Sequence, residues 1–186
     1  MAVRTGQQFL DGLNDGREVW YDGQRVANVA EFAPFKAAVK STAKLYDLQH
    51  HPRFSEILTV ESPAIGERIA RPYEIPRTRD HLHLKREAYV VWAEATCEMM
   101  AALAPKKSFF AECAPARAEA VVGYYRHIAK HDLFLTHALL DTQLDKGMAR
   151  HQQSDPSIPL RVVDRNKDGL IVHGIKRIAT AAALCR

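Results

Sequence analysis

Hydrophobic positions at the start of the chain recur first at helical and then at strand spacing. Thr5 followed three residues later by Gln8 is a capping-box pattern, which predicts a short helix through Leu13. Apolar and aromatic residues then flank Asp22-Gly23, a dipeptide that accepts the positive φ angles of a type I′ turn. The first 30 residues therefore predict a short helix followed by a β-hairpin.

A second helical stripe begins at Phe32, where apolar residues recur every three or four positions as far as Tyr46. Pro34 is compatible with this helix because proline is tolerated in the first turn. Residues 52–77 contain four prolines and show no sustained period. We expect them to form a long ordered loop that lies on a larger body.

Two long amphipathic helices are predicted in the middle of the chain. The first opens at Thr78, continues as an apolar stripe and closes at Ala104-Pro105. Its stripe consists of Leu82, Tyr89, Trp92, Ala93, Thr96, Met99, Met100 and Leu103. The second helix runs from Pro115 to Lys130, with basic residues in its last turn as the helix dipole favours. Its predicted inner face consists of Ala116, Ala120, Tyr124 and Ile128.

The last part of the sequence changes to strand-forming residues. Residues 160–163 and 170–173 flank a turn-prone segment and predict a second hairpin. Because one hairpin is marginal alone in water, these strands are expected to begin a larger sheet. We therefore predict an α+β chain, with a mainly helical domain over residues 1–140 and the start of an incomplete β-rich domain over residues 141–186.

Composition narrows the class of protein. With 47% hydrophobic and 26% charged residues, the 186-residue chain has the balance of a protein with a packed core. Its formal charge of +4 comes from basic residues that never gather into a run, which argues against nucleic-acid binding. No apolar stretch is long enough for a membrane span or a signal peptide. The three cysteines form no CxxC pair, which favours a reducing cytoplasm over disulfides or zinc.

The sequence contains no complete motif for binding a metal or a nucleotide. His127 and His131 are four residues apart on a predicted helix, but no Glu of an HExxH pattern and no third ligand accompany them. We expect no metal site there. The patterns GxGxxG, GxxxxGK[ST] and GxSxG are absent from the sequence.

Several blocks of residues, spread over nearly the whole chain, occur in a specific order. They are Arg4-Thr5-Gly6-Gln7-Gln8-Phe9-Leu10, Asp15-Gly16-Arg17-Glu18-Val19-Trp20, Leu45-Tyr46-Asp47, Trp92-Ala93-Glu94-Ala95-Thr96, Asp132-Leu133-Phe134-Leu135-Thr136-His137-Ala138-Leu139, Gln143-Leu144-Asp145-Lys146 and the segment from Gly169 to Thr180. Together they resemble the amino-terminal portion of the oxygenase components of the 4-hydroxyphenylacetate 3-monooxygenase family and its halophenol-hydroxylating relatives.

The resemblance implies an acyl-CoA-dehydrogenase-like fold and an oxidoreductase of aromatic compound catabolism. In this family a separate flavin reductase supplies reduced FAD, which activates O2 so that a phenol such as 4-hydroxyphenylacetate is hydroxylated ortho to its hydroxyl group. The protein orients the phenol and excludes water. A homo-oligomer is implied if the full fold is present.

The resemblance also implies roles for individual residues. His137 corresponds to the histidine that binds the phenol oxygen, a task that suits an imidazole titrating near neutral pH. The block Gln143, Leu144, Asp145 and Lys146 corresponds to the family's FAD-contacting PQ-x-DR block. Thr180 corresponds to a threonine that touches the flavin.

Two departures leave an alternative open. Lys146 stands where the family has arginine, so it keeps the charge but cannot make a planar bidentate contact. Where the family has G-R-[ST]-P-D-Y, whose Arg and Tyr hold the phenol, this chain has Ala101-Ala102-Leu103-Ala104-Pro105-Lys106. The alternative is a truncated, non-catalytic remnant that acts as a partner-binding module.

Overall fold

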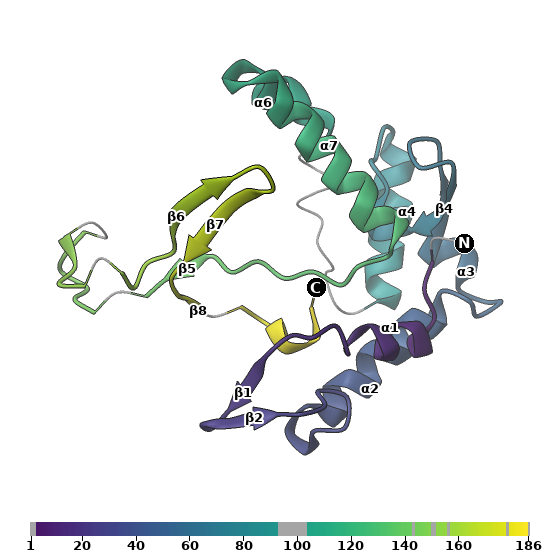
Figure 1. Cartoon of the computed structure of the whole chain (residues 1–186). Coiled ribbons are helices and arrows are strands. Elements are labelled where there is room, and N and C mark those ends of the chain that lie inside the picture. Colours follow the sequence, from purple (N-terminus) through teal and green to yellow (C-terminus); the bar gives the residue numbers. More distant parts are fainter. Residues whose placement is uncertain are drawn as a thin grey trace. The chain divides into compact units, whose positions relative to one another are not determined.

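The computed structural model describes residues 3–92, 104–142, 144–149, 152–155, 157–177 and 179–185. Contacts divide the chain into two compact units (Figure 1). Unit 1 comprises Met1–Leu135 together with Ala183–Arg186, and unit 2 comprises Thr136–Ala182. Long helices occur in unit 1 and hairpin strands in both, so the predicted α+β class is confirmed. The expected assignment of residues 141–186 to an incomplete β domain stays a prediction.

Unit 1 alternates helices with two antiparallel hairpins (Figure 1). Its elements are α1 (Gly6–Gly12), β1 (Val19–Tyr21), β2 (Gln24–Val26), α2 (Ala33–Leu48), α3 (Ser55–Leu58), β3 (Thr59–Ser62), β4 (Glu67–Ala70), η1 (Arg71–Tyr73), α4 (Arg79–Val91), η2 (Ala104–Lys106), α6 (Lys107–Cys113), α7 (Pro115–Lys130) and, where the chain returns, η4 (Ala182–Leu184). The η4 turn is held by Arg17, whose Nη1 donates to the backbone oxygens of Ala183 (2.9 Å) and Cys185 (2.5 Å).

The N-terminal elements form as their sequence predicts. The Thr5 hydroxyl accepts from the backbone N of Gln8, and the Gln8 side chain accepts from the backbone N of Thr5, so the capping box is present. Asp22 and Gly23 join β1 to β2 with φ angles of 48° and 73°. The helix expected from Phe32 is α2, with proline in its first turn.

The expectation of a long loop over residues 52–77 is wrong. This segment contains α3, the β3–β4 hairpin and η1, with Thr59 paired to Ala70 at the open end of the hairpin. Strands of four residues are too short to show a sustained alternation in the sequence. Pro63 lies outside both strands, and the turn closes at Gly66 with φ 76°, so the prolines do not interrupt the ladder.

The first predicted long helix is α4, which Thr78 caps by accepting from the backbone N of His81. Its inner face is offset from the predicted stripe, because Lys85 and Ala88 are buried whereas Leu82 is 57% exposed. Lys85 can be buried since its ammonium group donates to the backbone oxygen of Glu74 at 2.9 Å. Trp92, which follows the last residue of α4, is 4% exposed and is buried as predicted. The rest of the predicted stripe, residues 93–103, lies outside the described residues.

The second predicted long helix is α7, with the predicted bounds but a different inner face. Ile128 is buried as expected, whereas Tyr124 is 47% exposed and Ala116 and Ala120 are also exposed. The buried tyrosine is Tyr125, whose hydroxyl donates to the backbone oxygen of Tyr73 at 2.7 Å. That partner lies 52 residues away, so the period of the helix alone could not identify the inner face.

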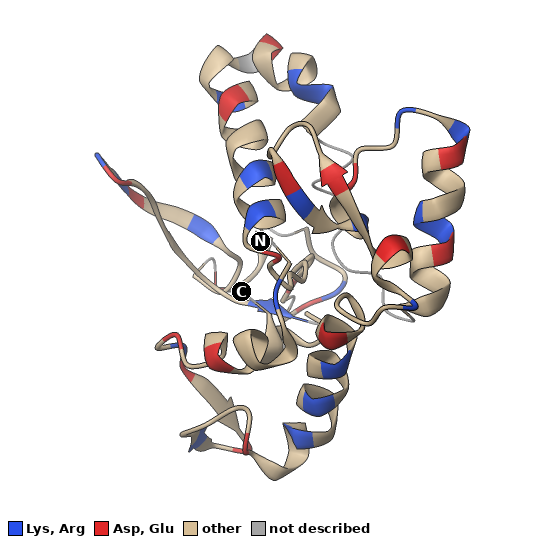
Figure 2. Ribbon diagram, turned by 90° about the vertical axis from the view of Figure 1, so that its right-hand side faces the viewer, with Lys and Arg blue, Asp and Glu red and all other residues tan. Residues whose placement is uncertain are grey.

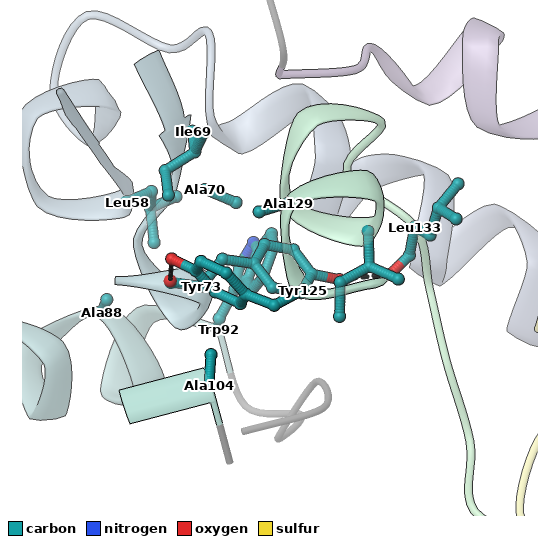
Figure 3. Packing of buried hydrophobic residues seen from close by; sticks show 11 residues of the cluster. Leu58, Ile69, Ala70, Tyr73, Ala88, Trp92, Ala104, Tyr125, Ala129 and Leu133 are labelled. Atoms are coloured by element: carbon teal, nitrogen blue, oxygen red, sulfur yellow. Dashed lines mark hydrogen bonds between the residues drawn. The ribbon is translucent and has the colours of Figure 1, made fainter. Parts of the chain in front are cut away.

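Two apolar clusters form the core of unit 1. One joins β3, β4, η1, α4 and α7 around Tyr73 and Tyr125, and Figure 3 shows these two rings among aliphatic side chains. Within this cluster the hydroxyl of Tyr73 also donates to the backbone oxygen of Leu133. The other cluster joins α1, β2, α2 and η4 around Phe9, which stacks on Tyr46 with ring centroids 5.0 Å apart.

Unit 2 contains two antiparallel strand pairs. Strand β5 (Leu140–Asp141) pairs with β8 (Lys176–Arg177), and β6 (Arg161–Asn166) pairs with β7 (Gly169–His173). The predicted second hairpin is thus confirmed, with longer strands and a shorter turn than expected. All residues of β6 and β7 are exposed, including apolar side chains on both strands.

Acidic and basic residues are interspersed along the helices and hairpins (Figure 2). This arrangement agrees with the scattered charges of the sequence. Among the described residues, no helix combines the length and apolar character that a bilayer crossing requires.

A buried polar group joins the N-terminus, α2 and the end of α7. The side chain of Asp132 accepts from the backbone N of Arg4 (3.1 Å) and from Nε2 of Gln49 (3.0 Å). Its backbone oxygen accepts from Nε of Arg4 (2.9 Å) and from the hydroxyl of Tyr46 (3.1 Å). Burial raises the pKa of Asp132 to about 6, although the bonds from Gln49 and Arg4 counteract this shift.

Asp132→Asn should change the pH dependence of stability. Because the folded-state pKa lies above the unfolded value, the stabilising effect of Asp132 is complete below about pH 4 and is lost as the pH rises through about 6. Relative to the variant, the natural chain should therefore lose up to about 3 kcal/mol between these pH values. Urea unfolding at several pH values measures the difference, with Asp11→Asn on exposed α1 as the control. A pH-independent difference would contradict the assignment.

Gly6 should not tolerate a methyl group. A Cβ atom there would lie 2.5 Å from the backbone oxygen of Ala43 and 2.7 Å from Oδ2 of Asp47. Gly6→Ala should therefore push α1 away from α2 and lower the free energy of unfolding by about 1–3 kcal/mol. Gly12→Ala is the matched control, because its Cβ would meet only the flexible side chain of Arg4, at 3.2 Å. Equal losses in the two variants would refute close packing at Gly6.

Candidate functional site

His137 lies in an extended segment that follows α7. Asp132 ends the helical region with a φ angle of 46°, and Leu133 and Phe134 then enter the two apolar clusters of unit 1. From Thr136 the chain belongs to unit 2, where His137 is exposed. The imidazole is therefore open to a ligand rather than enclosed in the core.

The β5–β8 ladder determines how the segments that contain His137 and Thr180 are placed relative to each other. Leu140 pairs with Arg177 and Asp141 with Lys176, in antiparallel register. Lys176 Nζ lies 2.7 Å from Oδ1 of Asp141, which ties the two strands together. His137 lies three residues before β5 and Thr180 three residues after β8, so both segments leave the ladder at the same end. Thr180 is exposed and precedes Ala181, which has a φ angle of 55°.

The cofactor-binding block predicted at residues 143–146 leaves the ladder at its other end. Leu144, Asp145 and Lys146 are exposed, and Gln143 lies outside the described residues. Gln153, only 6% exposed, organises this segment. Its Oε1 accepts from the backbone N of Leu144 and of Asp145, both at 2.9 Å, and its Nε2 donates to backbone oxygens of Asp145 (2.8 Å) and Met148 (3.0 Å).

Gly174 determines the path of the backbone that leads into β8. Its φ angle is 138°, and a Cβ atom there would lie 2.5 Å from Cα of Leu160 and from the backbone oxygen of Pro159. Ile175 then donates from its backbone N to the backbone oxygen of Ile158 at 2.8 Å. A glycine is therefore required where β8 begins, which sets the position of the strand that leads to Thr180.

The structure thus brings some predicted site residues together and separates others. The segments of His137 and Thr180 share one end of a ladder, whereas Lys146 follows the opposite end, and none of the three lines the larger pockets found among the described residues. Gln153 was not identified from the sequence, because a glutamine in a polar run carries no signal of burial. Among the described residues no group of His, Cys, Asp and Glu could hold a metal, including His127 and His131.

Comparison with known proteins identifies the family to which this chain belongs. The model of the family described as "4-hydroxyphenylacetate 3-hydroxylase N terminal" matches residues 5–186. The chain belongs to this family. The resemblance of its sequence blocks to 4-hydroxyphenylacetate 3-monooxygenase oxygenase components is thereby confirmed.

The relatives that this chain matches are much longer than the chain itself. The 4-hydroxyphenylacetate 3-monooxygenase oxygenase component of a Geobacillus species is 33% identical over 99% of the chain, which covers 39% of that protein. The Thermus thermophilus component is 34% identical over 96% of the chain, which covers 38% of it. The 4-nitrophenol 2-monooxygenase oxygenase component of a Rhodococcus species is 29% identical over 97% of the chain.

Solved structures of this family share the fold. An oxygenase component of 4-hydroxyphenylacetate 3-monooxygenase, complexed with FAD and 4-hydroxyphenylacetate, superposes with a TM-score of 0.87 at 32% identity, over 98% of this chain and 39% of that one. An archaeal 4-hydroxybutyryl-CoA dehydratase from N. maritimus superposes with a TM-score of 0.82 at 19% identity, which shows likeness of fold alone.

Gln153→Ala should loosen the segment around Lys146. Removing the buried amide leaves the backbone N–H groups of Leu144 and Asp145 without their acceptor. Their amide hydrogens should exchange at least about tenfold faster, measured by NMR. Gln152→Ala is the control, since that exposed side chain accepts from the backbone N of Ala149 instead. Unchanged exchange at both amides would exclude this role for Gln153.

Proposed function

We propose that this chain supplies one part of the site of a two-component FAD-dependent monooxygenase that hydroxylates a phenol ortho to its hydroxyl group. The observation that carries the proposal is the β5–β8 register, which directs the segments of His137 and Thr180 to the same end of one ladder. The two residues reach that end from opposite directions along the chain, 43 positions apart. Such a convergence is what a shared ligand requires.

The side chains match the groups that they would hold. Exposed His137 can accept the proton of a phenol and then hold the phenolate oxygen. Exposed Thr180 offers a hydroxyl that can donate to or accept from a flavin ring. FAD, once reduced by a separate reductase, would supply the activation of O2.

Lys146 suits a different part of the cofactor. Because its segment leaves the ladder at the end opposite to His137, the two residues would contact groups that are far apart on one extended molecule. FAD is such a molecule, with an isoalloxazine ring at one end and phosphates further along. An exposed ammonium group is a suitable point charge for a phosphate or a flavin oxygen.

The length of the relatives limits what this chain does alone. Since it spans about two fifths of their length, the relatives hold further residues that can complete a site of this kind. We propose 4-hydroxyphenylacetate or a related phenol as the substrate, a flavin reductase as a partner, and a homo-oligomer for the full fold.

A partner-binding module is the second candidate. The β6–β7 hairpin exposes Val162, Leu170 and Val172 at 45–56% of their surface, and these side chains share one face through the pairing of Val162 with Val172. The missing G-R-[ST]-P-D-Y motif also favours a role without turnover. A partner protein that covers this face would bury these apolar side chains in a small interface.

Binding of reduced FAD tests the cofactor part of the proposal. With dithionite under anaerobic conditions, the chain should bind FAD in a saturable titration. Lys146→Glu should weaken binding at least about tenfold through charge reversal. Lys167→Glu, in the exposed turn between β6 and β7, is the control and should leave the affinity within about twofold. A chain that does not bind FAD contradicts the proposed cofactor site.

Admission of air then separates the two candidates. Phenol-dependent oxygen consumption that His137→Ala abolishes and His173→Ala preserves would support the oxygenase. His173 is a matched control because it is exposed on β7. FAD binding without any phenol-dependent consumption would favour the non-catalytic module.

A further inference from the structure

A pocket of about 440 Å³ lies in unit 1 and is lined by none of the residues assigned to flavin or phenol. The β3–β4 hairpin, the segment after η1, the first half of α4 and Tyr125 of α7 surround it. Its volume falls in the range of small-molecule pockets. Most of its surface is apolar, and Val60, Ile69, Ile75 and Leu84 are among the side chains that line it.

One wall of this pocket carries a fixed carboxylate–imidazole pair. Oε2 of Glu74 accepts from Nη1 of Arg71 at 3.0 Å, while its Oε1 lies 3.2 Å from Nδ1 of His81. Glu74 and Arg71 are more than nine-tenths buried, whereas the side chain of His81 is 39% exposed. Nδ1 of His81 is buried and makes no hydrogen bond among the described residues, so the imidazole keeps bonding capacity.

Arg71 makes this wall rigid. Its Nε donates to the backbone oxygen of Ile57 (2.5 Å), and its Nη2 donates to those of Glu56 (2.7 Å) and Thr59 (2.9 Å). The guanidinium group is therefore satisfied by α3 and β3 and holds Glu74 in one orientation. A pair that is preorganised in this way needs little further ordering when a ligand binds.

Tyr125 contributes a second polar group to the pocket, on the side next to the apolar core. Its ring lies in the apolar cluster of Figure 3, and its hydroxyl donates to the backbone oxygen of Tyr73. Burial raises the pKa of Tyr125, so its hydroxyl stays protonated near neutral pH. The pocket thus combines an apolar body with polar groups at defined places.

The charges around the pocket cancel. Its acidic lining residues are Glu61 and Glu74, and its basic ones are Arg71 and Arg77. These four charges sum to zero, so an anionic or a cationic ligand would gain little net attraction and would lose its hydration. An uncharged ligand avoids this loss. A hydroxyl group can both donate and accept, so it suits a carboxylate–imidazole pair whichever nitrogen carries the proton.

We propose that this pocket binds a small uncharged molecule with an apolar ring and one hydroxyl group, which faces Glu74 and His81. None of the proposed flavin and phenol residues lines this pocket, and all of them belong to unit 2. It would let the chain take up a simple phenol or cyclic alcohol without any flavin.

The test uses 4-methylphenol as the probe and the full 186-residue chain without FAD. Saturable binding should perturb the His81 ring signals in proton NMR, which His81→Phe identifies by their absence. Leu84→Trp should fill the pocket and weaken binding at least tenfold, whereas Leu82→Trp should leave the dissociation constant within twofold. Leu82 is the matched control because it is exposed on the same helix and does not line the pocket. Benzoate, the anionic analogue, should bind at least tenfold more weakly.

Two results would overturn the proposal. One is the absence of saturable binding of 4-methylphenol to a chain whose far-UV circular dichroism shows that it is folded. The other is binding that Leu84→Trp and His81→Phe leave unchanged and that His137→Ala removes, because the probe would then occupy the proposed oxygenase site. Retention of binding in His137→Ala, together with loss in Leu84→Trp, supports the pocket even if the oxygenase proposal fails.

Discussion

The fold of unit 1 depends on the burial of Asp132 among groups from two distant segments. A carboxyl group out of water is destabilising unless donors surround it, and here the donors come from the N-terminal segment and from α2. The positive φ angle of Asp132 turns the chain out of the helical region at the same place. One residue therefore fixes where α7 ends, where the segment around Arg4 lies and where the extended segment towards His137 begins.

A second buried carboxylate, Glu74, performs a similar task in the other half of unit 1. Arg71 bridges it to the backbone of α3 and β3, so α3, the β3–β4 hairpin and η1 share one polar centre. Both polar centres adjoin apolar clusters in which tyrosine hydroxyls donate to backbone oxygens. Satisfied polar groups at these points specify one arrangement of the helices, which apolar packing alone does less sharply.

The sequence predicts the elements of this fold better than their contacts. Capping at Thr5 and the turn at Asp22-Gly23 are local, and both are found as expected. The inner faces of α4 and α7 depend on partners far along the chain, such as the backbone of Tyr73, so periodicity misplaced them. The β3–β4 hairpin was not predicted, because its strands are too short to show an alternation of apolar and polar residues. The burial of Gln153 was not predicted, because burial of a glutamine depends on the backbone around it.

Part of the resemblance to the family rests on the polar centre around Asp132. Its first block contains Arg4 and Gly6, another contains Tyr46, and a third begins at Asp132, all of which contact one another or pack α1 against α2. These residues fix the fold, which the superposition on family structures reproduces. His137 and Thr180, by contrast, are exposed and bear no part of that packing. The first set of residues therefore bears on the stability of the fold and the second does not, so activity has to be measured apart from fold.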